Sequence, residues 1–238
     1  MVNSKEKNLI LCFSSIHVHS DSENNRELEY QMCYEQLLRI VPNNFDIIFL
    51  DNTMDSFESL SPRVEKLKSI ISKNTHLFRN YNLGANGNKG MGELEMLLTA
   101  YDKFSFDEYE KICYFTGRRI VTCPYVFDKT NTLDKDALMS NPPLLQIMTG
   151  QEHPVNPELY NDMFFSMKTD TMKKYIEYTK NNLQNNIKNG IGSEQNLFHF
   201  INENNIQYEW LNSLGFIRND WEMFTHQYSS TKNNMQWI

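Results

Sequence analysis

The chain has 238 residues, of which 40% are hydrophobic, enough to build one sizeable buried core without disulfides or metals. Its formal net charge is −7, from 23 basic and 30 acidic side chains, which argues against bulk nucleic-acid binding through phosphate neutralisation. No stretch approaches the about 20 consecutive apolar residues of a membrane span. The composition predicts a soluble acidic globular protein with no nucleic-acid partner and no transmembrane segment.

The cysteines are widely spaced and form no Cys-x-x-Cys pair; they stand at Cys12, Cys33, Cys113 and Cys123. This pattern is typical of buried free thiols in a reducing compartment rather than of a disulfide framework or a zinc site. The apolar run at residues 9–13 is too short for the core of a signal peptide. We therefore expect a cytoplasmic protein.

The first half of the chain alternates strand-like and helix-like segments. Short apolar runs predict strands at residues 8–15, 45–50, 75–81 and 111–115. Helical spacing of apolar residues predicts helices at 26–41, from Ser61-Pro62 onwards, and at 93–104. This order predicts an α/β fold with a mostly parallel central sheet flanked by helices.

The second half is less regular. Residues 130–143 are polar and predict a surface loop, followed by a strand at 162–167 and a helix at 169–187. Ser193 is predicted to cap a helix that runs to about residue 204, and 206–210 predicts a late strand. No repeat or linker divides the chain, so we expect a single domain over 1–238, with a ligand-binding half at 1–125 and a second half at 126–238.

Ligands of parallel sheets bind at the carboxyl ends of the strands, so the loops there are the first candidates. Four of the nine glycines fall in one such loop, at Gly84, Gly87, Gly90 and Gly92. Lys89 is followed by Gly-Met, which excludes a P-loop. We expect backbone amides of this loop, with Asn82, Gly84 and Lys89, to contact an anionic ligand. The alternative is a turn with a helix cap.

Two other strand ends carry polar residues. Asp51 and Asn52 follow the second strand, where a carboxylate can accept bonds from a base or ribose; the alternative is an Asx-turn that closes the strand. Gly117, Arg118 and Arg119 follow the fourth strand, where two arginines can pair with a diphosphate. The alternative is arginines bonded to local carboxylates.

Glu194 lies in the first turn of a predicted helix, where it can act as a general base toward a hydroxyl. The helix dipole alone also favours a carboxylate there. His17 and His19 form a His-x-His pair after the first strand that can ligate a metal; the alternative is that they bond to the backbone of their loop.

Together these segments resemble the GT-A superfamily of nucleotide-sugar glycosyltransferases over nearly the whole chain. Three stretches carry the resemblance: residues 49–56 (FLDNTMDS), 79–97 (RNYNLGANGNKGMGELEML), and 192–195 (GSEQ) with 205–211 (NIQYEWL). The resemblance implies a nucleotide-diphospho-sugar donor and a glycan or other hydroxyl acceptor. The donor base is expected near Ser14, Ser15, Asp51 and Asn52, and the phosphates near the glycine loop and Arg118/Arg119. It also implies that Glu194 is the base, and that His226 corresponds to a late histidine near the diphosphate.

The chain departs from the family where an Asp-x-Asp metal motif usually follows the fourth strand. Residues 111–119 read KICYFTGRR there, and the Asp-x-Asp at 134–136 lies in a predicted polar loop. We expect no cofactor, although a divalent cation stays open, and we expect Arg118 and Arg119 to replace the metal.

Two alternatives remain open at this stage. The chain can keep the fold as a non-catalytic binding module. His17 and His19 also resemble the opening motif of the polymerase-and-histidinol-phosphatase family, which would make the protein a metal-dependent phosphoesterase.

Overall fold

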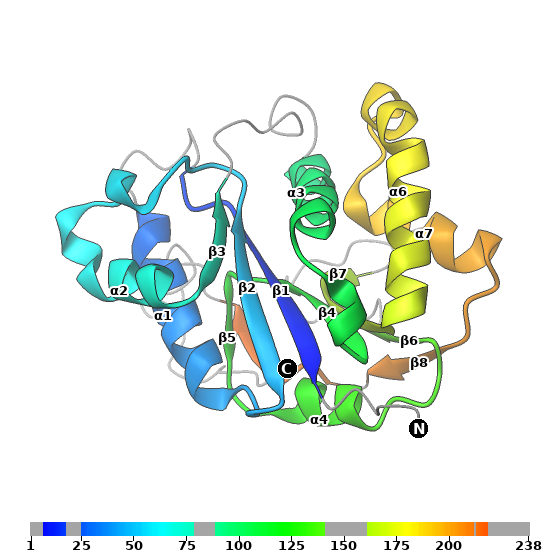
Figure 1. Ribbon diagram of the computed structural model, residues 1–238, viewed down its shortest axis with the longest axis horizontal. Coiled ribbons are helices and arrows are strands. Elements are labelled where there is room, and N and C mark those ends of the chain that lie inside the picture. Colours follow the sequence, from blue (N-terminus) through cyan, green and yellow to red (C-terminus); the bar gives the residue numbers. More distant parts are fainter. Residues whose placement is uncertain (1–6, 18–24, 79–88, 141–160, 212, 219–238) are drawn as a thin grey trace, which may run out of the picture.

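The computed structural model describes residues 7–17, 25–78, 89–140, 161–211 and 213–218, and its centre is a seven-stranded sheet (Figure 1). The strand order is β3-β2-β1-β4-β7-β6-β8. The first four neighbours are parallel, β7 is antiparallel to both β4 and β6, and β6 is parallel to β8. The mostly parallel α/β sheet predicted from the sequence is confirmed. The strands are β1 (Asn8–Ser14), β2 (Phe45–Asp51), β3 (Thr75–Phe78), β4 (Lys111–Thr116), β6 (Ala137–Ser140), β7 (Asn161–Lys168) and β8 (Tyr208–Leu211).

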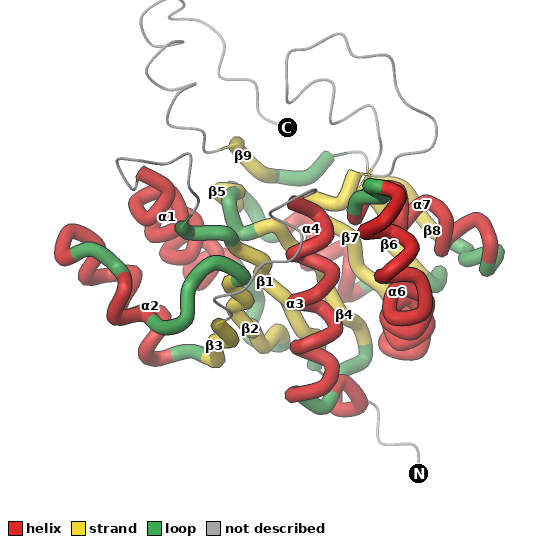
Figure 2. Tube along the Cα trace, turned by 90° about the horizontal axis from the view of Figure 1, so that it is seen from above, coloured by secondary structure: helices red, strands yellow, loops and turns green. Residues whose placement is uncertain are grey.

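Helices cover both faces of this sheet. One face carries α1, α2 and α4, and the other carries α3, α6 and α7. A separate antiparallel ribbon of β5 (Arg119–Val121) and β9 (Phe216–Arg218) packs on the α1 face, and Figure 2 shows it across the strands from α3 and α6. The α-helices are α1 (Asn25–Ile40), α2 (Glu65–Lys73), α3 (Lys89–Lys103), α4 (Tyr125–Asn131), α6 (Thr169–Asn189) and α7 (Ser193–Glu203), with short 3-10 helices at Phe57–Ser59, Pro62–Val64 and Phe106–Glu108. None of the described helices has the length and apolar character needed to cross a bilayer.

The apolar run of β1 is explained by burial on both sides. Every residue of this strand is buried. Ile10 and Cys12 join the core under α1, whereas Leu9, Leu11 and Phe13 join the core under α3. A strand covered on both faces needs apolar side chains at successive positions, which is why it lacks a polar alternation.

The prediction of a surface loop at 130–143 is wrong for its described part. Ala137–Ser140 is strand β6, all four residues of which are buried, and it pairs with β7 on one side and β8 on the other. The prediction failed for two reasons. The charged residues 134–136 come directly before the strand, and a strand of four residues is too short to show a periodic pattern. Helix α4, which ends at Asn131, was missed as well.

Helix starts also differ from the prediction. Helix α3 begins at Lys89 rather than at residue 93, so Gly90 and Gly92 lie inside it. Gly192 is the N-cap of α7, and Ser193 is the first residue of the helix rather than its cap. Ser61 is the N-cap of the 3-10 helix at Pro62–Val64 but makes no side-chain cap bond; its Oγ instead donates to Glu27. Buried partners elsewhere in the chain outweighed these local signals.

The topology brings two distant helix starts to one edge. Strands β1 to β4 are parallel, so their carboxyl ends share an edge, and α3 begins after β3 on that side. Strand β7 runs back to the opposite edge, α6 returns, and α7 therefore begins at the carboxyl edge again. Glu194 in the first turn of α7 thus lies at the edge where the sequence placed the ligand.

Candidate functional site

The ends of β1 and β2 form one buried polar network. Ser14 pairs with Asp51 in the strand register, and the backbone nitrogen of Asn52 donates to the oxygen of Ser14 (3.3 Å). The Oγ of Ser14 donates to the Leu50 carbonyl (2.9 Å), and the Oγ of Ser15 donates to Oδ1 of Asn52 (2.7 Å). The four predicted residues Ser14, Ser15, Asp51 and Asn52 are therefore together, and each is at most 4% exposed.

The carboxylate of Asp51 is fully occupied by neighbouring groups. Its Oδ2 accepts the backbone N–H of Ile16 (2.9 Å). Its Oδ1 accepts the backbone N–H and the hydroxyl of Thr53 and the backbone N–H of Met54, each at 2.8 Å. Burial raises the pKa of Asp51, and these hydrogen bonds oppose the rise. The residue closes its own turn, as in the Asx-turn alternative, and also holds the loop after β1.

Asn52 differs from Asp51 in having an unused donor. Its Oδ1 accepts the Ser15 hydroxyl, but its buried Nδ2 has no hydrogen-bond partner in the described part of the chain. A buried amide without a partner costs free energy, and a ligand or an ordered water that accepts the hydrogen bond would remove this cost. The sequence singled out Asn52 by its place after the strand, not by this feature.

The residues after β4 are held by local contacts. The N–H of Gly117 donates to the Phe13 carbonyl (2.6 Å), and a Cβ at position 117 would lie 2.9 Å from that oxygen, so close packing requires the glycine. Arg118 forms an ion pair with Glu29 of α1, with Nη2 2.9 Å from Oε2. The Nε of Arg119 lies 3.1 Å from the sulfur of Met163 at the start of β7. The ion pair of Arg118 agrees with the alternative interpretation of this motif, in which the arginines bind carboxylates of the protein itself.

This donor set does not fit a divalent cation. Guanidinium groups cannot ligate a metal ion, and they occupy the position after β4 where the family's Asp-x-Asp would stand. The Asp-x-Asp of this chain lies at the other edge: Asp136 precedes β6, and its Oδ2 accepts the N–H of Gln207 (3.3 Å). Within the described ranges no three His, Cys, Asp or Glu side chains form a group that could hold a metal ion.

The two helix starts at the carboxyl edge touch each other. A Cβ built on Gly90 would lie 2.5 Å from Oγ and 2.7 Å from the backbone nitrogen of Ser193. The glycine therefore allows the first turns of α3 and α7 to meet backbone to backbone. Glu194, the next residue of α7, is half-buried. The contact thus joins the start of α3 to the residue that precedes the predicted base.

His17 is bound by a carboxylate that the sequence did not single out. Its Nε2 lies 3.0 Å from Oε1 of Glu27, which is 1% exposed and also accepts the backbone N–H of Ser61 (3.0 Å). Three residues of α1 that contact the site were not predicted from the sequence: Glu27, Glu29 and Tyr30. The hydroxyl of Tyr30 accepts the N–H of Ser15 (2.9 Å). In the sequence, the two glutamates look like solvated residues of an amphipathic helix, so no local signal distinguishes them.

Several predicted residues lie outside the described ones: Asn82, Gly84, His226 and His19. Lys89 is the first residue of α3.

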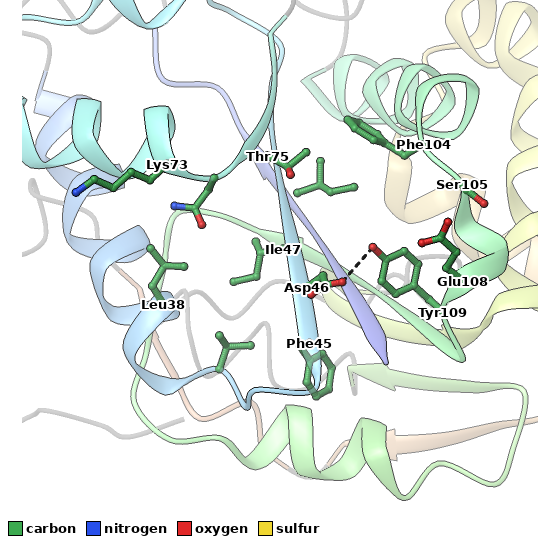
Figure 3. Close-up of a pocket in the computed structure, with 13 residues that line it drawn as sticks. Leu38, Phe45, Asp46, Ile47, Lys73, Thr75, Phe104, Ser105, Glu108 and Tyr109 are labelled. Atoms are coloured by element: carbon green, nitrogen blue, oxygen red, sulfur yellow. Dashed lines mark hydrogen bonds between the residues drawn. The ribbon is translucent and has the colours of Figure 1, made fainter. Parts of the chain in front are cut away.

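A cavity of about 510 Å³ lies at the opposite, amino end of the strands (Figure 3). It opens because β3 pairs with β2 only from Ile48 onwards, which leaves Phe45–Ile47 without a neighbour on that side. Asp46 lines it and binds Lys7 (3.1 Å) and the Tyr109 hydroxyl (3.3 Å). The cavity is therefore separate from the carboxyl-edge residues.

Comparison with known proteins gives one informative result. No protein-family model matches the sequence. No curated protein matches it either. Among solved structures, a candidate nucleotide-diphospho-sugar transferase from Desulfovibrio desulfuricans G20 is similar, with 12% identity and a TM-score of 0.54 over 95% of this chain and 89% of that chain. Mouse xyloside xylosyltransferase 1, in its apo form, has 10% identity and a TM-score of 0.49 over 94% of this chain and 90% of that chain. The first likeness shows the fold, which is of the GT-A type as predicted.

Proposed function

We propose that the protein is a divergent glycosyltransferase that moves a sugar from a nucleotide-diphospho-sugar to a hydroxyl acceptor such as a glycan. One observation supports the proposal: on a GT-A-type sheet, Gly90 of α3 contacts Ser193 at the carboxyl edge, and Glu194 is the next residue of α7. Ligands of open α/β sheets bind at that edge, so a base there can reach an acceptor.

The donor nucleotide would bind at the ends of β1 and β2. Asn52 offers its unused Nδ2 as a donor to the base. The Ser15 hydroxyl holds the side-chain amide of Asn52 in place, and the Ser14 carbonyl holds its backbone N–H. Asp51 acts through the loops that it closes, since its oxygens already accept four hydrogen bonds. Each of these groups is rigidly bonded, which lowers the entropic cost of recognising a nucleotide.

The diphosphate would lie between the start of α3 and the end of β4. Lys89 and the glycine loop, with Asn82 and Gly84, are proposed to supply backbone amides and a positive charge. Arg118 and Arg119, which follow Gly117 at the end of β4, would supply further positive charge. Glu29 pre-orients the guanidinium of Arg118. Positive groups that are fixed before the reaction stabilise a leaving group without reorganisation, and this is the basis for proposing a metal-independent enzyme. His226 is proposed as a further phosphate contact.

The proposed step is a single displacement. Glu194 takes the proton of the acceptor hydroxyl, and the acceptor oxygen forms a bond to the anomeric carbon of the sugar. The bond from that carbon to the donor phosphate oxygen breaks, and its electron pair leaves with the nucleoside diphosphate. The product would have inverted configuration; retention would exclude Glu194 as a simple inverting base.

The phosphoesterase alternative is not favoured. His17 bonds to Glu27, and the fold is that of a candidate sugar-nucleotide transferase. The non-catalytic module differs from the proposal only in lacking turnover.

A donor screen tests the proposal. Thermal unfolding is measured with UDP-glucose, UDP-galactose, UDP-xylose and GDP-mannose, each with EDTA and with Mn²⁺. A ligand that binds only the native state at about 100 times its Kd adds about 2.7 kcal/mol of stability, which is a clear shift in Tm. We expect one donor to bind and to release nucleoside diphosphate in EDTA. Binding without turnover indicates the inert module, and no binding to any donor overturns the proposal.

A further inference from the structure

The first turn of α7 is attached to α6 through one buried amide, that of Asn196. This side chain is 1% exposed. Its Oδ1 accepts the Nδ2 of Asn186 (2.7 Å), and its own Nδ2 donates to the hydroxyls of Thr179 (2.9 Å) and Tyr175 (3.3 Å). All three partners belong to α6 and are themselves buried.

These bonds give α7 one position along α6. Asn186 and Tyr175 lie about three turns apart on the face of α6 that meets Asn196. If α7 slid or rotated, the buried amide would lose its partners together, and each unpaired buried polar group carries a desolvation cost. Apolar contacts of α7 tolerate small shifts, whereas hydrogen bonds are lost within a fraction of an ångström.

The same turn is fixed from the other side by α3, since Gly90 leaves no space between its backbone and Ser193. Glu194 lies between these two attachments along the chain, one residue after Ser193 and two before Asn196. Two residues correspond to about 200° around a helix, so Asn196 faces α6 while Glu194 is on the other side of α7. The side chain of Asn196 therefore points away from Glu194 and can affect it only through the position of α7.

We infer that Asn196 is a positioning residue that holds the carboxylate of Glu194 at the acceptor hydroxyl. The inference rests on the proposed function, because it gives Asn196 a role only through the base. A purely structural residue would lower stability without acting on the base, and the two roles predict different kinetics.

The test is a double-mutant cycle on nucleoside diphosphate release, using the donor that the screen selects. We expect Asn196→Ala to lower kcat by about 10-fold or more while the KM for the donor stays within about twofold. In the Glu194→Gln background the same change should alter kcat by less than about twofold, because the base is already absent.

Three variants make the cycle interpretable. Asn202→Ala is the matched control, since Asn202 is an exposed asparagine at the far end of α7 whose side-chain amide donates to the Phe198 carbonyl of its own helix. Ile201→Ala removes a buried side chain from the next turns, and should lower stability but not kcat per folded molecule. Asn186→Ala removes one hydrogen bond of the network and should lower kcat in the same way as Asn196→Ala, but by less. If Asn196→Ala fails to fold, Asn186→Ala takes its place in the cycle.

The outcomes separate the two proposals. Two results overturn the positioning role and leave the proposed function standing. One is an equal loss of kcat with and without Glu194; the other is an unchanged kcat in the folded Asn196 and Asn186 variants. Full turnover of Glu194→Gln removes the base and this inference with it. Absence of turnover with every donor overturns both.

Discussion

Gly90 of α3 and Ser193 of α7 are in backbone contact: a Cβ at position 90 would lie 2.7 Å from the nitrogen of Ser193. A Gly-to-Ala change inside a helix normally stabilises it by up to about 1 kcal/mol. Here we expect Gly90→Ala to lower the free energy of unfolding by about 1–3 kcal/mol, because the added methyl overpacks the contact.

Urea unfolding measures this effect, with Asp102→Ala on the exposed side of α3 as a control that should change stability by less than about 0.5 kcal/mol. The donor assay should show reduced kcat for Gly90→Ala, since the shift moves Glu194. Unchanged or increased stability of this variant would mean that the two helices do not meet in solution.

Glu194→Gln is expected to lower kcat by about 100-fold or more, with a smaller effect on donor affinity, because an amide cannot accept the proton. Glu203→Gln makes the same substitution at the far end of α7 and should leave turnover unchanged. The comparison is made by steady-state release of nucleoside diphosphate. Near-normal turnover of Glu194→Gln would exclude this residue as the base.

Arg118 and Glu29 form an ion pair whose side chains are 18% and 6% exposed. Arg118→Met removes the guanidinium that forms an ion pair with the buried Glu29 carboxylate, and we expect it to cost about 3–5 kcal/mol of stability. The double variant Arg118→Met/Glu29→Leu should recover most of this loss, since neither charge remains.

The double variant also isolates the binding role of Arg118. If Arg118 contacts the diphosphate, titration calorimetry with the selected donor should show about 2 kcal/mol or more of lost binding free energy in this stable protein. Wild-type affinity would leave Arg118 with its structural role alone and move the diphosphate site elsewhere.

Asp51→Asn tests the role of the carboxylate that closes the β1 and β2 loops. The NH2 group of the new amide would face the backbone N–H of Ile16, so that this hydrogen bond is lost, and the remaining hydrogen bonds would be made to a neutral group instead of a charged one. We therefore expect a loss of about 2–3 kcal/mol in stability. Asp55→Asn, at an exposed position four residues on, is the control. Weaker donor binding with wild-type stability would instead show that Asp51 contacts the ligand directly.

His76 on β3 predicts a pH dependence of stability. Its ring stacks on Phe78 (centroids 4.2 Å apart), and neither ring nitrogen has a hydrogen-bond partner among the described residues. Burial lowers the pKa of His76 to about 3. Between pH 6.5 and 3 the unfolded chain therefore binds a proton that the folded one does not, so stability falls as the pH drops.

His76→Phe keeps the stacked ring and removes the titration. From pH 7.5 to 5.0 the wild-type protein should lose at most about 2 kcal/mol more than the variant, measured by urea unfolding at the two pH values. An identical loss in both proteins would show that His76 takes up its proton in the folded state as readily as in the unfolded one.

Some of the site could be predicted from the sequence because its signals are local. Asp51 and Gly117 stand directly after apolar runs, and strand ends of a parallel sheet meet at one edge, so their placement followed from the order of elements. The pairing of Ser14 with Asp51 agrees with this reasoning. The bonds of these groups were not predictable, since Arg118 meets Glu29 from a helix that precedes it by almost ninety positions.

The sequence by itself determined the α/β class, the first four strands and the helix that carries Glu194, because burial requires apolar runs in the strands and apolar residues at helical spacing in the helices. Only the tertiary structure decided that β6 is a buried strand, that Gly90 belongs to α3, and that Asn196 attaches α7 to α6. Hydrophobic periodicity is a property of neighbouring residues. The partner of a buried polar group is set by which distant segments meet, and no local pattern encodes that choice.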